Sequence, residues 1–352
     1  MGWASRQKLG TRTSDKDIRD AADALDKSGL RAAGYVYVEV DDGWQGVRDA
    51  EGVLHPNDRF PDMKALGDYL HSKGLKFGLS TSAAPKSCDD FEGSYGHEAA
   101  DARAFAEWGV DYLVYDWCSA NALHMSQAEM QGVYQRMGEA LRASSRDIVF
   151  AVSQAGDFDV GQWGAKTGAN LWRTNRDIDE SWSSIAEAGF SQNGKESAAA
   201  PGRWNDPGLL QTGIVGVSAD EYRMQMNLWA VLAAPLMIGN DVRNLSRDAT
   251  ALLANRELIA IDQDAQGRQG KRIAQVGDTE VWARPLADGA MALAFFNRGN
   301  QGAPVAVSWQ QLGIDGVRQV RDVWWHESMG RANNNYVVYL TPHTSLLLRL
   351  SR

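Results

Sequence analysis

The sequence of 352 residues is poor in cysteine and histidine, and positive charge is not in excess. Two Cys and six His occur, with neither a Cys-x-x-Cys pair nor a His cluster at metal-ligand spacing, so we expect no metal site. The formal net charge of −9 argues against a nucleic acid partner, because binding to a polyanion depends on a basic surface.

Long apolar runs are also absent, so we expect no membrane span. The chain opens on Met1-Gly2-Trp3 without a basic and apolar leader, which suggests that a secretion signal was removed or never existed. Cys88 and Cys118 are either two unrelated buried thiols or one disulfide. A disulfide would place the protein in an oxidising compartment.

Tryptophan, by contrast, is abundant, with thirteen residues in the chain. Indole faces stack on sugar rings as well as in protein cores. The count therefore modestly favours a carbohydrate partner, although most of these side chains are expected in the core.

Helical and strand patterns alternate over residues 1–265. We predict helices over 14–29, 63–72, 97–108, 127–143 and from 218 to 234, and strands over 35–40, 76–81, 112–115, 147–154, 171–177, 203–208 and 236–241. With Met1-Gly2-Trp3 as the first strand, eight β segments are separated by helices. This pattern predicts an α/β fold, a (β/α)8 TIM barrel.

The helical period disappears in residues 266–352. Short alternating strands are predicted over 279–284, 290–297, 320–325 and 336–350, with turns at Asp288-Gly289 and around 333–335. We therefore predict a C-terminal antiparallel β-sandwich domain over 266–352.

Several predicted strands end in carboxylates. Asp116 follows the apolar run 112–115, which is typical of a strand buried on both faces, and Asp41, Asp42, Asp177, Asp206 and Asp241 follow other strands. A barrel brings such strand ends to one mouth, where two carboxylates can act as nucleophile and general acid on a glycosidic bond. The alternative is that these aspartates only cap helices, which we expect for Asp241 in particular. No phosphate loop or serine elbow is found, and no cofactor is expected.

Eight short motifs occur in order along the chain. They are Met1-Gly-Trp3, Val40-Asp-Asp-Gly-Trp44, Lys76-Phe-Gly78, Asp111-Tyr-Leu-Val-Tyr-Asp-Trp-Cys118, Trp172-Arg-Thr-Asn-Arg-Asp-Ile178, Trp204-Asn-Asp-Pro207, Ala233-Ala-Pro-Leu236 and Ile261-Asp-Gln-Asp264. Together they resemble the α-galactosidase and α-N-acetylgalactosaminidase family, glycoside hydrolase family 27. The resemblance covers essentially the whole chain, and eight ordered motifs are specific where any one would be weak.

The resemblance implies a retaining exo-glycosidase that releases terminal α-linked galactose from an oligosaccharide or glycoconjugate. Asp116 matches the nucleophile of the family and Asp177 its acid/base, while Arg173 would hold the region of the 2-hydroxyl. Asp41 and Asp42 match the pair that accepts from the 4- and 6-hydroxyls.

The resemblance also implies further positions in the site. Gln154 would contact the 2-hydroxyl, Trp117 would form a wall of the pocket, and Trp3, Lys76 and Asp206 would complete the set of substrate-binding residues. Cys88 and Cys118 fall where the family has its active-site disulfide. We therefore expect a secreted, periplasmic or otherwise oxidising location.

The chain departs from the family at several positions of the sugar pocket. Arg6 replaces a tryptophan, Ser80 a tyrosine, Val114 a lysine, Gly208 an aspartate and Ala155 an aromatic residue, and Gly43 stands at a frequent cysteine position. Such changes are expected to alter specificity before chemistry, because both catalytic carboxylates are retained.

Other functions therefore remain open. Activity on β-L-arabinopyranosides, on α-N-acetylgalactosaminides or on α-1,6-glucans, in the manner of isomaltodextranases, would fit the same family. Gln154 favours a plain hydroxyl over an N-acetyl group at C2. The alternative from another functional class is a non-catalytic sugar-binding protein. The sequence is also compatible with a homo-oligomer.

Overall fold

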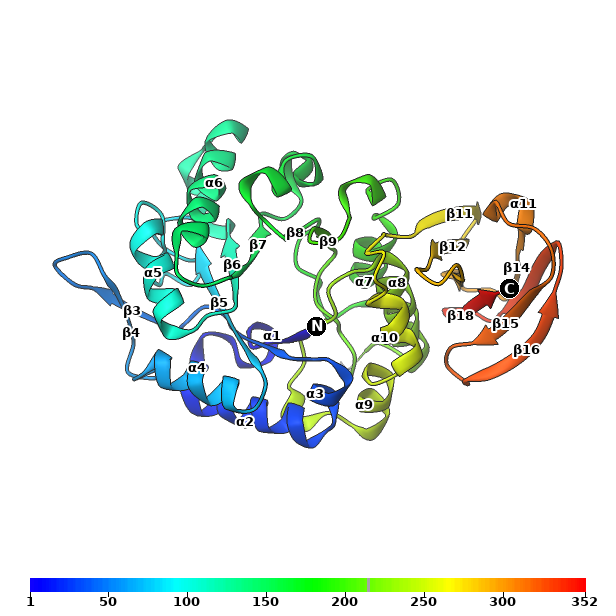
Figure 1. The fold of residues 1–352 in the computed structure, drawn as a ribbon, viewed down its shortest axis with the longest axis horizontal. Helices are drawn as coiled ribbons and strands as arrows, with labels where there is room; N and C mark the ends of the chain where they lie inside the picture. Colours follow the sequence, from blue (N-terminus) through cyan, green and yellow to red (C-terminus); the bar gives the residue numbers. More distant parts are fainter. Residues whose placement is uncertain (214–215) are drawn as a thin grey trace. The chain divides into compact units, whose positions relative to one another are not determined.

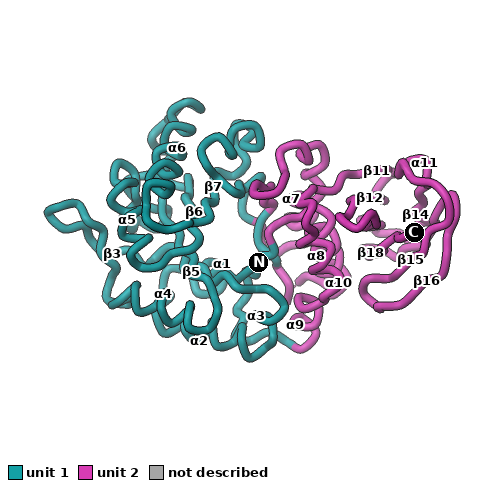
Figure 2. Tube along the Cα trace, viewed as in Figure 1, with its two compact units in different colours: residues 1–177, 208–210, 236–246 teal, residues 178–207, 211–235, 247–352 magenta. Residues whose placement is uncertain are grey.

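The computed structural model describes residues 1–213 and 216–352 and forms two compact units (Figure 2). The first comprises Met1–Asp177, Gly208–Leu210 and Leu236–Ser246, and the second comprises Ile178–Pro207, Gln211–Pro235 and Arg247–Arg352. In the described residues no helix has both the length and the apolar character needed to cross a bilayer. The boundary between 265 and 266 remains a prediction.

The first unit is built on a parallel sheet. Its strands are β1 (Gly2–Ala4), β2 (Tyr37–Val40), β5 (Lys76–Ser82), β6 (Tyr112–Asp116), β7 (Val149–Ser153), β8 (Leu171–Arg173) and β10 (Met237–Ile238), in the order β10-β1-β2-β5-β6-β7-β8. The eighth strand of this sheet, β9 (Trp204–Asp206), pairs next to β8, and its residues are part of the second unit. The (β/α)8 architecture predicted from the sequence is confirmed.

Helices lie outside these strands in the first unit (Figure 1). They are α1 (Arg6–Leu9), α2 (Asp15–Lys27), α3 (Leu30–Ala33), α4 (Met63–Ser72), α5 (Glu98–Trp108) and α6 (Gln127–Ala143), with the 3₁₀ helices η1 (Gly10–Arg12), η2 (Cys118–Leu123), η3 (Asp157–Gln162), η4 (Gly164–Thr167) and η6 (Val242–Asn244). Capping boxes begin α2 at Ser14 and α6 at Ser126, where the serine and the acidic residue three positions later satisfy free backbone N–H groups.

An antiparallel hairpin of β3 (Gln45–Arg48) and β4 (Leu54–Pro56) interrupts the βα pattern directly after β2. This hairpin was not predicted from the sequence. Its residues do not alternate clearly between apolar and polar, and Val47 is 75% exposed, so the strand signal is weak. The hairpin matters for the site because Gln45 supports Asp42, as described below.

The second unit contains α7 (Trp182–Phe190), η5 (Glu196–Ala198), α8 (Ala219–Leu232), α9 (Arg247–Leu253) and α10 (Arg256–Asp262). Helix α8 begins with the predicted capping box of Ser218 and Glu221. Most of its residues are buried, which explains why apolar side chains occur all around it.

The remainder of the second unit is an antiparallel β domain. A six-stranded sheet has the order β11 (Lys271–Val276), β12 (Thr279–Pro285), β13 (Met291–Asn297), β18 (Thr344–Ser351), β15 (Arg318–Asp322) and β16 (Glu327–Ala332). A second sheet pairs β14 (Ala303–Ser308) with β17 (Asn335–Leu340), and α11 (Trp309–Leu312) follows β14. The core between them includes Val281, Leu293, Phe295, Val305 and Leu348.

The predicted antiparallel domain is thus confirmed, but the single strand predicted over 336–350 is wrong. This segment forms β17 and β18, which belong to different sheets. The turn between them places His343 at a φ of 53°, in the left-handed region that ends a strand. The predicted turns at Gly289 and near Asn334 are present, both with positive φ.

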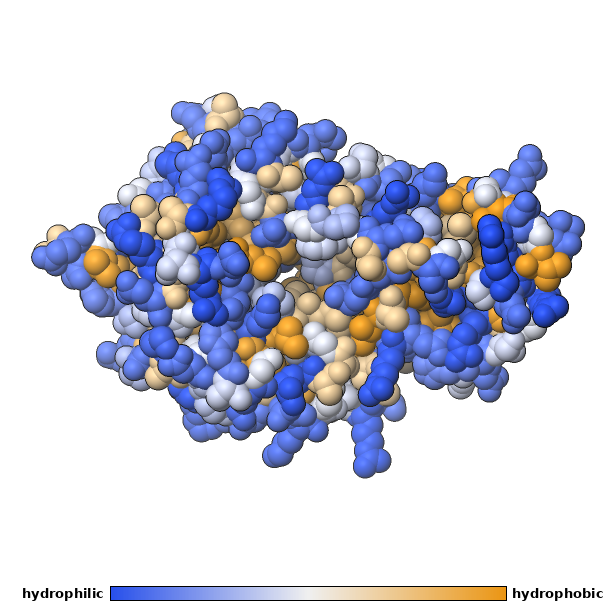
Figure 3. Space-filling model, viewed as in Figure 1, coloured by the Kyte–Doolittle hydropathy of each residue, from blue (hydrophilic) through white to orange (hydrophobic). Residues whose placement is uncertain are grey.

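Tryptophan is mainly a core residue, as expected. Eight of the thirteen are buried, namely Trp3, Trp44, Trp117, Trp163, Trp172, Trp229, Trp282 and Trp309. The face in Figure 3 is largely hydrophilic, with apolar residues in small groups.

Candidate active site

Asp116 ends β6, between two neighbouring strands whose last residues are serines. In the register of the parallel sheet it lies opposite Ser82 of β5 and Ser153 of β7. Val114 and Asp116 are partly exposed whereas Tyr115 between them is fully buried, so the two residues share the accessible face of the strand. The carboxylate is therefore presented at the carboxyl end of the sheet, where barrel enzymes place their chemistry.

The surroundings of Asp116 disfavour its charge. Burial and, to a smaller extent, the nearby charge of Asp177 raise the pKa of this carboxyl to about 6, while Ser153 and Arg173 act in the opposite direction. Asp116 is therefore only half ionised near pH 6.

Asp177 and Arg173 form an ion pair at the same site. Arg173 ends β8, and its Nη1 donates to Asp177 Oδ1 at 2.6 Å. The side chain of Asp177 is 87% exposed, whereas the side chain of Arg173 is 14% exposed. Because the charges of both residues act on Asp116, the structure brings these three predicted site residues together.

Asp42, which follows β2, is held by side chains from two other segments. Its Oδ1 accepts from Gln45 Nε2 at 2.8 Å and its Oδ2 accepts from Ser87 Oγ. The side chain is buried, so these donors fix the carboxylate in one orientation.

Asp41 is less constrained than its neighbour. Its Oδ1 accepts from the backbone N–H of Asp42 at 2.6 Å, while Oδ2 has no hydrogen-bond partner in the part of the chain that the structure describes. Burial, together with the charges of Asp116 and Asp42, raises the pKa of Asp41 to about 6, although the charge of Arg6 opposes this rise. Asp41 thus shares one electrostatic environment with Asp116.

Arg6 lies at the start of α1 and connects this site to the cysteine loop. Its Nη1 donates to Asp89 Oδ2 and lies 3.8 Å from Asp41 Oδ1. A cation therefore stands directly beside the carboxylate that the resemblance assigns to sugar binding.

Cys88 and Cys118 form the expected disulfide, with their Cα atoms 5.7 Å apart. A carboxylate oxygen of Asp116 and the two sulfur atoms all lie within 4.8 Å of one another. Among the described residues this is the one cluster of three potential metal ligands, and its sulfurs are joined to each other instead of being free as thiolates. The bridge therefore fixes the loop with Ser87 and Asp89 beside the carboxylates.

Gln154 follows β7 and is buried. Its Nε2 donates to Asp157 O at 2.8 Å, and its Oε1 accepts from Gly156 N at 2.8 Å. Ala155 beside it has a φ of 64°, a conformation that is costly for a residue with a Cβ. The amide supports its own loop, and a contact with a sugar remains a prediction.

The two tryptophans of the predicted site are packed against protein. Trp3 is fully buried, with its Nε1 donating to Asn240 O at 2.7 Å. Trp117 is 3% exposed, and its ring lies 5.5 Å from that of Tyr134. Their roles in sugar binding also remain predictions.

The structure does not bring Lys76 to these carboxylates. Lys76 is the first residue of β5, whereas Ser82, opposite Asp116, is the last. Six steps along a strand correspond to about 20 Å. The lysine lies near the ring of Tyr37, with Nζ 5.3 Å from the ring centroid.

Two further aspartates complete the set of carboxylates predicted at strand ends, and of these only Asp206 was predicted to bind substrate. Asp206 ends β9 in the second unit and is 8% exposed. Asp241 caps η6 by accepting from Arg243 N at 3.1 Å, as expected for a helix cap.

Three of the positions that depart from the family, Gly43, Ser80 and Val114, lie close to the candidate site or in the turn that follows β2. Gly43 has a φ of 105°, and an added Cβ would lie 2.6 Å from Thr11 O, so this turn requires glycine. Ser80 and Val114 are register partners on β5 and β6, and they lie next to Asp116 as two small neighbouring side chains.

The sequence matches the family described as "Alpha galactosidase A" over residues 6–264, and "Alpha galactosidase C-terminal beta sandwich domain" over 276–350. The α-galactosidase of Cyamopsis tetragonoloba is 39% identical over 349 residues, which cover 97% of this chain and 84% of that protein. Human α-galactosidase A is 38% identical over 306 residues, which cover 83% of this chain and 70% of that protein.

Solved structures give the same result. α-Galactosidase I from Mortierella vinacea superposes with a TM-score of 0.94 at 28% identity, covering 99% of this chain and 96% of that one. A family 27 β-L-arabinopyranosidase from Geobacillus stearothermophilus shares the fold, with a TM-score of 0.89 at 24% identity and coverage of 100% and 96%. The carboxylate site at the end of a barrel sheet and these matches together define a glycosidase. The chain belongs to the α-galactosidase family, glycoside hydrolase family 27.

Proposed function

We propose that the protein is an exo-acting, retaining glycosidase that releases terminal α-linked galactose without a cofactor. The observation that carries the proposal is the electrostatic cluster of Asp116, Asp177 and Arg173 at the ends of β6 and β8. The α-galactosidases among the relatives support galactose as the sugar.

Asp116 acts as the nucleophile in this mechanism. Its carboxylate attacks the anomeric carbon and forms a glycosyl ester, while Asp177 transfers a proton to the departing glycosidic oxygen. Asp177 then takes a proton from water, which attacks the same carbon and releases Asp116. The exposure of Asp177 suits a group that must reach both the leaving oxygen and water.

Asp41 and Asp42 would bind the sugar, with different tasks. Asp42 has both oxygens occupied by Ser87 and Gln45 and so presents a fixed orientation. Asp41 retains an oxygen that can accept from a sugar hydroxyl.

The cysteine bridge bears on where the protein works. A disulfide beside the catalytic carboxylates supports an oxidising compartment, and a secreted or periplasmic protein would meet this condition. The substrate would be an α-galactoside oligosaccharide or glycoconjugate.

A second candidate substrate is a β-L-arabinopyranoside. Arg6 stands beside Asp41, the carboxylate expected to accept from the 4- and 6-hydroxyls, and this pairing leaves less acceptor capacity for a C6 hydroxymethyl group. A pentopyranoside has no such group.

Initial rates on nitrophenyl glycosides test the proposal, with α-galactoside, α-N-acetylgalactosaminide, β-L-arabinopyranoside and α-glucoside as substrates and Asp116→Asn as the blank. We expect α-galactoside to be hydrolysed fastest. Faster hydrolysis of the arabinopyranoside would transfer the assignment to the second candidate. Inactivity on all four and on isomalto-oligosaccharides would contradict an enzyme and favour a sugar-binding protein.

A further inference from the structure

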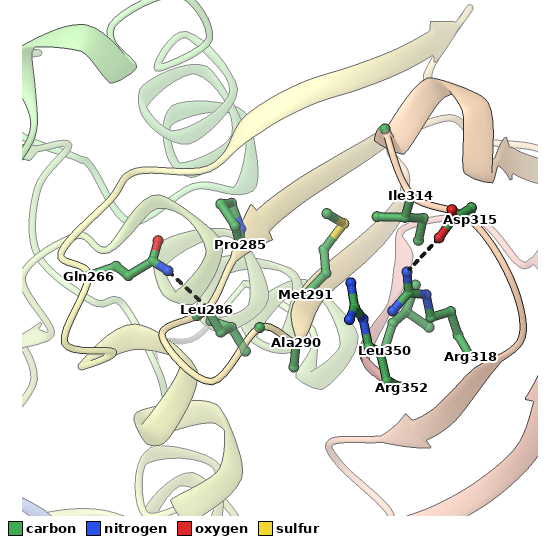
Figure 4. Close-up of a pocket in the computed structure, with 12 residues that line it drawn as sticks. Gln266, Pro285, Leu286, Ala290, Met291, Ile314, Asp315, Arg318, Leu350 and Arg352 are labelled. Atoms are coloured by element: carbon green, nitrogen blue, oxygen red, sulfur yellow. Dashed lines mark hydrogen bonds and ion pairs between the residues drawn. The ribbon is translucent and has the colours of Figure 1, made fainter.

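A pocket lies in the antiparallel β domain and contains none of the residues of the candidate active site. Its volume is about 450 Å³. Figure 4 shows that its lining comes from four places: the segment between α10 and β11, the connection between β12 and β13, the segment from α11 to the start of β15, and the end of β18. The residues that define its chemistry are Gln266, Leu286, Met291, Ile314, Arg318 and Arg352.

Arg318 gives this pocket a buried positive charge that the protein hardly compensates. The residue is 7% exposed, and in the described chain its Nε has no hydrogen-bond partner. The nearest carboxylate is Asp315, 3.7 Å from Arg318 Nη2, but the side chain of Asp315 is fully exposed. A guanidinium buried in this way is unfavourable unless an anion accepts its hydrogen bonds.

Gln266 offers a second unused group on the wall of the pocket. Its Nε2 donates to Leu286 O at 3.1 Å, while its Oε1 is buried and has no partner among the residues described. This oxygen can accept from a hydroxyl. Arg352 adds a second, exposed guanidinium to the lining.

The remaining wall is apolar. Leu286 and Leu350 are buried, and Met291 and Ile314 are partly buried against the core of the domain. A ligand that fits must therefore combine an anionic group such as a carboxylate, at least one hydroxyl and an apolar face. A sugar acid has this combination, because the C–H groups of a pyranose ring form an apolar face beside its polar edge.

We propose that this pocket binds the hexuronate residue of an acidic saccharide. The carboxylate accepts from Arg318 and Arg352, a ring hydroxyl donates to Gln266 Oε1, and the ring lies on Met291 and Leu286. The requirement for an anionic group follows from Arg318, whereas the choice of a sugar carboxylate rests on the proposed glycosidase function. Binding here would hold the enzyme on a polysaccharide that carries both uronate and galactose.

Calorimetric titration of the full chain with α-1,4-linked trigalacturonate tests the proposal. A neutral galactose trisaccharide and sodium acetate, at equal ionic strength, are the comparison ligands. We expect trigalacturonate to bind and the other two not to, and Arg318→Gln to weaken binding about tenfold or more. Arg331→Gln removes the same charge from an exposed position on β16 and should leave the affinity unchanged.

A second variant covers the case in which Arg318→Gln folds poorly. Gln266→Glu keeps the size of the side chain but adds a negative charge that repels a carboxylate, so trigalacturonate binding should be lost while the melting temperature stays close to that of the parent. Equal binding of the neutral trisaccharide, equal binding of acetate, absence of any binding, or full affinity in both variants would each overturn the proposal.

The catalytic assignment is tested separately by hydrolysis of nitrophenyl α-galactoside. This small substrate carries no uronate, so Arg318→Gln should retain the parental rate. An inactive protein that still binds trigalacturonate would contradict the proposed function but not the proposed binding pocket. An active protein that does not bind trigalacturonate would contradict the binding pocket but not the proposed function.

Discussion

Asp42, which follows β2, and Asp116, which ends β6, lie at the same end of one sheet, but their carboxylates have different surroundings. Asp42 accepts from Ser87 and Gln45, so both of its oxygens are held. Asp116 is half-buried beside Asp177, and its pKa is raised to about 6. A carboxylate surrounded by fixed donors is suited to orienting a ligand, whereas one whose charge is disfavoured is suited to forming a bond and leaving again.

This contrast departs from the simple expectation for two catalytic carboxylates, in which the general acid has the raised pKa. Here burial acts on the proposed nucleophile, while the proposed acid is exposed and paired with Arg173. Arg173 interacts with both carboxylates. Its charge favours the ionised form of Asp116, and its guanidinium donates a hydrogen bond to Asp177.

The largest expected effect comes from removing the reacting carboxylate. Asp116→Asn should lower kcat on nitrophenyl α-galactoside by about 10³-fold or more, because an amide cannot form the glycosyl ester. Asp241→Asn is the matched control, since Asp241 is another strand-end aspartate whose carboxylate caps η6. It should reduce stability by about 1 kcal/mol and keep kcat near the parental value. Comparable losses in both variants would contradict the assignment of Asp116.

The same substitution should stabilise the fold. The pKa of Asp116 is raised by burial, so ionisation costs stability as pH rises from the unfolded value of 3.8 through about 6. Asp116→Asn should therefore increase the free energy of unfolding at pH 7 by on the order of 2 kcal/mol, with little gain at pH 4. Denaturant titrations at the two pH values measure this difference. A gain that is equal at both would show that charge burial is not the cause.

Much of the architecture was predictable from local patterns. Ser14, Ser126 and Ser218 each precede an acidic residue by three positions, and all three begin helices through capping boxes. The carboxyl ends of apolar segments correctly indicated where Asp41 and Asp116 would lie, because a parallel strand must leave the core at its end.

What was missed depends on contacts between distant segments. Ser87 holds Asp42 although 45 positions separate them, and no sequence period links the two. Lys76 was grouped with the site because its motif resembles the family, but β5 is seven residues long and the lysine starts it. The clear signal for Arg6 was its departure from the family, which indicated a change but not its contact with Asp89.

Breaking the rigid support of Asp42 should give an intermediate effect. Ser87→Ala removes the donor to Asp42 Oδ2 and leaves a buried oxygen unsatisfied, so KM should rise about tenfold while kcat changes little. Ser119→Ala serves as the control, because Ser119 also lies beside a bridged cysteine but donates to Lys86 O. If the two variants have the same KM, the fixed orientation of Asp42 does not contribute to binding.

The smallest expected effect concerns Arg6, whose charge acts on Asp41 and whose guanidinium donates to Asp89. Burial raises the pKa of Asp41 to about 6, and Arg6 limits this rise, so Arg6→Gln should raise that pKa further. Protonated Asp41 cannot accept fully from a sugar hydroxyl, and the acid limb of kcat/KM should therefore move to higher pH by less than about one unit. Arg6→Lys retains the charge and should restore the parental profile, although Lys lacks the fork that binds Asp89. A shift of equal size in both variants would show that the geometry of the guanidinium, and not its charge, sets the state of Asp41.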